Sequence, residues 1–135
     1  MNVYNVQIPI KSLTNHDLEY YADKLNIRSF RGSFMKNEIP EQINSTECAI
    51  INLDDSSGPG THWVTYWIEP KCSIYFDSFG LDPPNEIVDY LSRPLHYSTN
   101  EIQDRDSVIC GHLCLTVLKG LTLGKKYNEI IISLI

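Results

Sequence analysis

Apolar residues recur at the three- and four-residue spacing of an amphipathic helix in two stretches of the chain. The first covers residues 14–26 and opens with Thr14 and Asp17, which fit a capping box. The second covers residues 110–123, and Gly124 is a suitable residue to end it. The apolar stripe of this second helix consists of Leu113, Cys114, Val117, Leu118 and Leu121. We therefore expect two well-defined helices.

Short apolar runs in the middle of the chain indicate strands. Residues 48–53 form a nearly continuous apolar run, as expected for a buried strand. Residues 62–69 and 73–78 are rich in aromatic and β-branched residues, and Pro70 and Lys71 mark a turn between them. The two runs therefore predict a β-hairpin, in which residues whose numbers sum to about 140 pair with each other.

The remaining segments have weaker patterns. Residues 28–41 read as loop and short pieces, because a glycine and a proline interrupt them. Residues 85–92 predict a short helix, residues 95–99 are compatible with a strand, and residues 128–135 form a final helix or strand. This order of elements predicts an α+β fold with a mainly antiparallel central sheet flanked by helices.

Length and composition are those of a small globular protein. The chain has 135 residues, which predicts one domain over residues 1–135. Its formal net charge is −6 and its cations are scattered, so we expect no nucleic-acid partner, because phosphate binding needs clustered cations. No apolar run approaches the roughly 20 residues of a membrane span, and the first residues lack the features of a signal peptide. We expect neither membrane attachment nor secretion.

The four cysteines of the chain are expected to stay reduced, because no secretory signal is recognisable. Cys110, His112 and Cys114 are close in sequence, but a second ligand cluster is missing, so we expect no metal and no cofactor. We interpret His16, His96 and His112 as structural or surface residues.

Cys110 lies where an irregular loop meets the second helix. In the first turn of a helix, the dipole and the free N–H groups both favour the thiolate. The glycine that follows, Gly111, would let a substrate approach the backbone closely. The position indicates a candidate nucleophile, and the alternative is a small apolar residue that enters the core.

His62 and Asp77 lie on the two strands of the predicted hairpin, and the register places Asp77 within one residue of the position opposite His62. A carboxylate there would orient the imidazole and stabilise the imidazolium. The alternatives are a half-exposed histidine at a strand end and an aspartate that caps the turn at Gly80. Gln103 could supply an oxyanion-hole donor together with the N–H of Cys110, although a loop glutamine is normally solvated.

These residues stand in an order that resembles the clan CE cysteine proteases, which include the adenovirus maturation protease (adenain) and the proteases of SUMO and ubiquitin-like proteins. Three segments carry the resemblance: GTHWVTY at 60–66, IYFDSFG at 74–80 and QDRDSVICG at 103–111. The region ahead of the histidine also resembles adenain, at Phe30–Gly32, Pro40 and Cys48–Asn52. The resemblance covers most of the chain and implies the adenain/SUMO-protease-like fold.

The resemblance implies a role for each matched side chain. Cys110 would be the nucleophile, His62 the base and acid, Asp77 the residue that orients the histidine, and Gln103 the oxyanion donor. The SUMO-protease branch also uses aspartate at the Asp77 position, whereas adenain has glutamate there. Trp63 would line the narrow groove that admits glycine-rich sequence before the cut, with a place in the core as the alternative.

Gly60 and Gly111 would also contact the substrate. The nearest resemblance is to the adenain-like proteases of virophages and Polinton or adintovirus-type elements, which implies a cysteine endopeptidase that matures capsid precursors. That setting implies the reducing interior of a host cell, in a virus factory or the nucleus, and the virion. The family also implies an activating peptide, for which Cys72 is a candidate docking residue, and we expect a monomer.

Two other functions remain open. The chain could be an isopeptidase that removes ubiquitin-like or SUMO-like modifiers, although 135 residues leave little surface for a modifier. It could also be a non-catalytic interaction module of the same fold, although a decayed enzyme has no reason to keep all four residue types. An acetyltransferase on this scaffold is conceivable, but nothing indicates a coenzyme A site.

Overall fold

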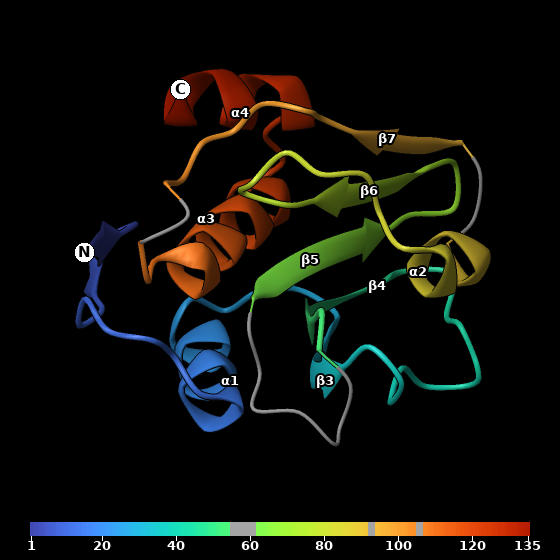
Figure 1. Ribbon diagram of the computed structural model, residues 1–135, viewed down its shortest axis with the longest axis horizontal. Coiled ribbons are helices and arrows are strands. Elements are labelled where there is room, and N and C mark those ends of the chain that lie inside the picture. The colour runs from blue at the N-terminus through green and yellow to red at the C-terminus, as the bar shows by residue number, and fades with distance from the viewer. Residues whose placement is uncertain (55–61, 92–93, 105–106) are drawn as a thin grey trace.

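A five-stranded sheet forms the centre of the computed structural model, which describes residues 1–54, 62–91, 94–104 and 107–135. Strands that are neighbours in the sheet are also consecutive in the sequence (Figure 1). The strands are β3 (Phe30–Met35), β4 (Glu47–Asn52), β5 (Trp63–Ile68), β6 (Ser73–Phe76) and β7 (Leu95–Tyr97). A separate two-stranded ribbon pairs β1 (Asn2–Val3) with β2 (Val6–Gln7).

Helices cover both faces of this sheet. The first, third and fourth helices contribute to the apolar cluster on one face, and the second helix contributes to the cluster on the other face. The helices are α1 (Asn15–Lys24), α2 (Asn85–Tyr90), α3 (Cys110–Thr122) and α4 (Tyr127–Leu134). Within the ranges given above, no helix is long and apolar enough to cross a membrane.

The α+β class is confirmed, but the sheet is mixed rather than mainly antiparallel. The predicted hairpin is present, since β5 pairs antiparallel with β6, and β4 also pairs antiparallel with β5. Both edge strands, β3 and β7, pair parallel with their neighbours. A parallel neighbour requires a crossover connection. α2 supplies it between β6 and β7, and residues 36–46 supply it between β3 and β4.

The prediction of loop and short pieces over residues 28–41 is wrong, because β3 lies within them. None of the residues of β3 is fully buried, so the strand has no alternation of apolar and polar positions that a sequence pattern could reveal. Its register also shifts between Phe30 and Ser33, where Gly32 has a φ of +136°. This edge strand is therefore defined by its pairing with β4.

Local signals in the sequence specify the ends of α1 well. Thr14 Oγ1 accepts a hydrogen bond from the Asp17 N–H at 3.1 Å, and Asp17 Oδ2 accepts one from the Thr14 N–H at 3.0 Å. The predicted capping box is thus confirmed. The final apolar segment, left open as helix or strand, is the helix α4.

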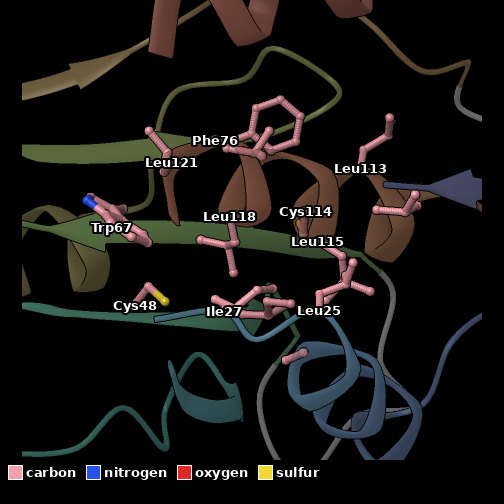
Figure 2. Close-up of a cluster of buried hydrophobic side chains, with 14 of the residues drawn as sticks. Leu25, Ile27, Cys48, Trp67, Phe76, Leu113, Cys114, Leu115, Leu118 and Leu121 are labelled. Atoms are coloured by element: carbon pink, nitrogen blue, oxygen red, sulfur yellow. The ribbon is translucent and has the colours of Figure 1, made fainter. Parts of the chain in front are cut away.

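The main core lies between α3 and the sheet (Figure 2). Leu115 and Leu118 of α3 are fully buried, as are Trp67 of β5 and Phe76 of β6. Burial of one such large side chain contributes roughly 1.5–3 kcal/mol. This packing fixes α3 against β5, and with it the position of Cys110, the first residue of α3.

A charged side chain, that of Glu47, is buried at the start of β4. Glu47 is 1% exposed and accepts hydrogen bonds from Tyr66 Oη at 2.6 Å, Tyr90 Oη at 3.0 Å and the Asn44 N–H at 2.6 Å. Arg31 Nη1 lies 3.1 Å from the same carboxylate. Four donors satisfy this carboxylate, which is what a structural buried charge requires.

Candidate active site

His62 and Asp77 meet at one end of the antiparallel pair β5 and β6. His62 directly precedes β5, and Asp77 directly follows β6. His62 Nε2 and Asp77 Oδ1 are 2.7 Å apart, and both side chains are buried, at 7% and 1% exposure. The Phe79 N–H also donates to Asp77 Oδ1, at 2.8 Å. The Gly80 N–H donates to the Asp77 carbonyl. Asp77 therefore both caps the turn at Gly80, which was the alternative role, and binds the histidine.

The backbone of Trp63 attaches this strand end to the first turn of α3. Its N–H hydrogen-bonds the sulfur of Cys110, and its carbonyl accepts a hydrogen bond from the Cys114 thiol at 3.5 Å. The two cysteines are one helical turn apart. Two hydrogen bonds to the backbone of one residue thus fix Cys110 beside His62, whose ring hydrogen-bonds the Cys110 sulfur. Because Nε2 is bound to Asp77, Nδ1 is the ring nitrogen that faces the thiol.

The ionisation of the two reacting groups follows from these contacts. Burial raises the pKa of the Cys110 thiol, but hydrogen bonds from His62 and from the Trp63 and Gly111 N–H groups outweigh burial, and the pKa is lowered below its ordinary value. Burial opposes the charged form of His62, but the hydrogen bonds to Asp77 and Cys110 raise its pKa to about 9. Both shifts favour a thiolate beside an imidazolium.

An aromatic ring covers the histidine. The rings of His62 and Phe79 are stacked, with their centroids 3.9 Å apart and an angle of 4° between their planes. The negative face of an aromatic ring favours a cation placed over it. The stack therefore restricts the rotation of the imidazole and supports its protonated form.

Gln103 lies on the same end of the sheet, in the segment between β7 and α3, and is 3% exposed. It is therefore not a solvated loop residue. Its Oε1 accepts a hydrogen bond from the Ser78 hydroxyl, and its Nε2 donates to the Ser107 carbonyl at 2.8 Å. As the first residue of α3, Cys110 also has an N–H without an intrahelical acceptor. An amide and a backbone N–H are the donor types of an oxyanion hole.

Of the three residues expected to contact substrate, Trp63 and Gly111 lie within the described residues. Trp63 is half-buried against the main core, and its indole Nε1 donates to the Leu13 carbonyl at 2.9 Å. Gly111 is buried, and a Cβ there would lie 3.0 Å from Leu18 Cδ2. Close packing of α3 on α1 is therefore one reason for a glycine at this position. Gly60 lies outside the described residues.

The other histidines and cysteines occupy core or surface positions. His112 is fully buried and its Nε2 contacts the Pro9 carbonyl at 2.7 Å, whereas His16 and His96 are exposed. All four cysteines are free, and Cys48 and Cys114 are buried in the core. Among the residues that the structure describes, no three His, Cys, Asp or Glu side chains are grouped as a metal site.

Sequence reasoning missed the contributions of Ser78 and Phe79. Both lie in the segment IYFDSFG that carries the family resemblance, but the resemblance implies a role only for the aspartate of this segment. A hairpin register one residue longer would have placed Phe79 opposite His62. No sequence signal links Ser78 to Gln103, because 25 positions separate them.

The fold and the site together define a class of protein. A thiol, an imidazole and a carboxylate in hydrogen-bonded succession form a centre for nucleophilic acyl transfer. The structure is similar to two crystal structures of the African swine fever virus pS273R protease, one of them containing selenomethionine. Each match has a TM-score of 0.60 and a sequence identity of 16%. The matched region covers 89% of this chain and 61% of the viral chain. This similarity establishes the SUMO-protease-like α+β fold.

The sequence is similar to that of the same viral protein. It is 25% identical to cysteine protease S273R of African swine fever virus over 109 positions, which cover 69% of this chain and 40% of the relative. The chain thus spans about two fifths of the length of this relative. No family model matches the sequence.

Proposed function

We propose that this chain is a cysteine endopeptidase, a hydrolase that acts on peptide bonds. The observation that carries the proposal is the hydrogen-bonded succession of Cys110, His62 and Asp77, in which the pKa of the thiol is lowered and that of the histidine is raised to about 9. The similarity in sequence to a protein named as a cysteine protease supports it.

In the proposed mechanism, the Cys110 thiolate attacks the carbonyl carbon of the scissile peptide. Negative charge develops on the carbonyl oxygen, where Gln103 Nε2 and the N–H of Cys110 donate hydrogen bonds. His62 then protonates the leaving amine, and the acyl group stays on sulfur as a thioester. His62 next takes a proton from water, which hydrolyses the thioester and restores the thiolate. Asp77 holds the imidazole in the required orientation throughout.

The proposed substrate is a protein cut after small or glycine-rich sequence, and a viral capsid precursor is the setting that the family resemblance favours. In that setting the enzyme acts as a monomer in the reducing interior of an infected cell and in the virion, with an activating peptide as a further partner. Nucleic acid is not proposed as a partner, because the net charge is −6 and phosphate binding needs clustered cations.

A panel of fluorogenic peptides tests the function directly. It contains peptides that end in Gly-Gly and Gly-x-Gly before the reporter group, and the modifiers ubiquitin and SUMO with the same reporter. We expect the wild type to cleave the short peptides and Cys110→Ser to cleave none. Cleavage of the modifiers with no cleavage of the peptides would replace the endopeptidase proposal with the isopeptidase alternative. Equal rates for wild type and Cys110→Ser would refute both.

A further inference from the structure

The turn that carries Asp77 also holds the side chain of Gln103. We infer that Ser78 is a positioning residue that fixes the amide of Gln103 with its Nε2 toward the oxyanion, and that one turn thereby aligns both the histidine and the oxyanion hole. The inference deepens the proposed function and rests on it for the role of Gln103. Ser78 itself does not touch the reacting atoms.

Three hydrogen bonds join Ser78 to the segment that carries Gln103. The Ser78 carbonyl accepts from the Ile102 N–H at 2.8 Å and from the Gln103 N–H at 3.1 Å. The Ser78 hydroxyl donates to Gln103 Oε1. Ser78 is 0% exposed and Gln103 is 3% exposed. Backbone and side chain of Gln103 are therefore both held by one buried residue.

The close approach of the two segments depends on Gly80. Its φ is +74°, and a Cβ at this position would lie 2.6 Å from the Thr99 carbonyl oxygen and 2.8 Å from the Asn100 carbonyl oxygen. The turn over residues 77–80 thus packs directly against backbone that leads to Gln103. The position of Ser78 relative to Gln103 is set by backbone contacts as well as by its own hydroxyl.

The hydrogen bonds allow only one orientation of the Gln103 amide. The Ser107 carbonyl can only accept, so the NH₂ group of Gln103 must face it, at 2.8 Å. Oε1 then faces Ser78, whose hydroxyl donates to it. One Nε2 hydrogen is used by Ser107, and the second is available for the oxyanion. Rotation of the amide by 180° would turn a carbonyl oxygen toward the developing negative charge.

Loss of the Ser78 hydroxyl removes the donor that favours the productive orientation. A neutral hydrogen bond contributes about 1 kcal/mol, so Ser78→Ala should slow a step that needs the oxyanion hole roughly fivefold. Loss of the amide itself in Gln103→Ala should slow it roughly a hundredfold or more. If Ser78 acts only through Gln103, the double variant should match Gln103→Ala alone.

The test compares two reactions of Cys110 that need no knowledge of the natural substrate. With p-nitrophenyl acetate, the thiolate forms an S–C bond and p-nitrophenolate leaves, through a tetrahedral oxyanion. With iodoacetamide, the thiolate displaces iodide with no oxyanion at the protein. The wild type, Ser78→Ala, Gln103→Ala and the double variant are compared, with Cys110→Ser as background. Ser73→Ala is the control, since Ser73 is as buried as Ser78 but begins β6, at the end of that strand away from the turn over residues 77–80.

We expect Ser78→Ala to slow acylation of Cys110 roughly fivefold and to leave alkylation within about twofold of wild type. The double variant should acylate at the rate of Gln103→Ala, and Ser73→Ala should change neither rate. If Ser78→Ala lowers the melting temperature enough to unfold the chain, Ser78→Gly, which also removes the hydroxyl and adds no thiol, takes its place.

The inference is overturned if the effects of Ser78→Ala and Gln103→Ala multiply, if Ser78→Ala slows alkylation as much as acylation, or if it slows neither. The proposed function fails separately. If acylation follows the predicted pattern but no peptide or modifier is hydrolysed, Ser78 positions Gln103 in an acyl-transfer site that is not a peptidase.

Discussion

Cys72 and Cys110 are both half-buried free thiols, and each contacts one ionisable side chain. Cys72 precedes β6, and its sulfur lies 3.8 Å from Glu69 Oε2. Burial and the negative charge of Glu69 both raise its pKa. Cys110 is also partly desolvated, but its hydrogen bond with His62 contributes to a lowered pKa. Burial alone therefore does not decide the reactivity of a cysteine in this protein.

The neighbour of each thiol is decided by the strand ends around it. Cys72 lies in the turn between β5 and β6, where Glu69 points toward it. Cys110 lies at the opposite end of the same pair of strands, where His62 and Asp77 meet. One end of the hairpin thus favours a thiol and the other a thiolate. The predictions below test which contacts produce this difference.

The largest effect is expected from His62→Ala. Without the imidazole, burial becomes the main influence on the pKa of the Cys110 thiol. This pKa should then rise, as the pKa of Cys72 does. Hydrolysis should fall by roughly 10⁴-fold or more, as for other nucleophile–base pairs. Mass mapping after brief iodoacetamide treatment at pH 7 should find Cys110 labelled no faster than Cys72. Fast labelling of Cys110 in this variant would mean that the helix alone activates the thiol.

Asp77→Asn should have the next largest effect. Against the effect of burial, the Asp77 carboxylate and Cys110 together raise the pKa of His62 to about 9. Hydrolysis needs the protonated imidazole, so the rate falls as pH rises through this value. Loss of an adjacent charge should lower that pKa by about 1–3 units. The alkaline limb of the pH profile of kcat/KM should move to lower pH by the same amount. An unchanged alkaline limb would show that the Asp77 carboxylate does not raise the pKa of His62.

Phe79→Leu should produce a smaller shift in the same direction. Leucine keeps an apolar cover over the imidazole but loses the stacked ring, whose interaction with a cation supplies roughly 0.5–1 kcal/mol. The alkaline limb should therefore move down by about 0.4–0.7 pH units. Phe79→Tyr, which keeps the ring, should restore the wild-type limb. A Leu variant with the wild-type profile would show that the stack only fills space.

The smallest effect is expected from Glu69→Gln, which acts on the other thiol. Removal of the negative charge should lower the pKa of Cys72 and raise its labelling rate at pH 8 by roughly two- to five-fold, because the pair is partly exposed and screened. The glutamine can still accept the hydrogen bond of Trp67 Nε1, which lies 3.0 Å from Glu69 Oε1. Cys110 serves as the internal control, and its labelling rate should not change.

In the hairpin, the sequence pattern predicts the strands and their pairing but not the exact register. Both strands and their antiparallel pairing are predicted, but Thr65 pairs with Phe76, one residue away from the expected register. The geometry of a turn decides such a shift, and periodicity does not encode it. The contact between His62 and Asp77 can be predicted in spite of this one-residue error. The stacking of Phe79 on His62 can be predicted only from the correct register.

Contacts between distant segments could not be predicted. The bond between Ser78 and Gln103 and the buried Glu47 with Arg31 depend on how separate segments pack. The same is true of β3, which has no pattern of its own. Local signals such as the capping box at Thr14 are self-contained and therefore reliable. The candidate site could be assembled because its residues lie at element ends and resemble the motifs of a known family.

The central claim is that Cys110 is held as a thiolate by His62. The most direct measurement is the rate of iodoacetamide labelling at each of the four cysteines between pH 5 and 10, resolved by peptide mapping. The account predicts that Cys110 reacts fastest and stays reactive well below the ordinary thiol pKa of about 8.5, while Cys72 reacts only above it. Equal rates and equal pH dependence at Cys110 and Cys72 would contradict the account.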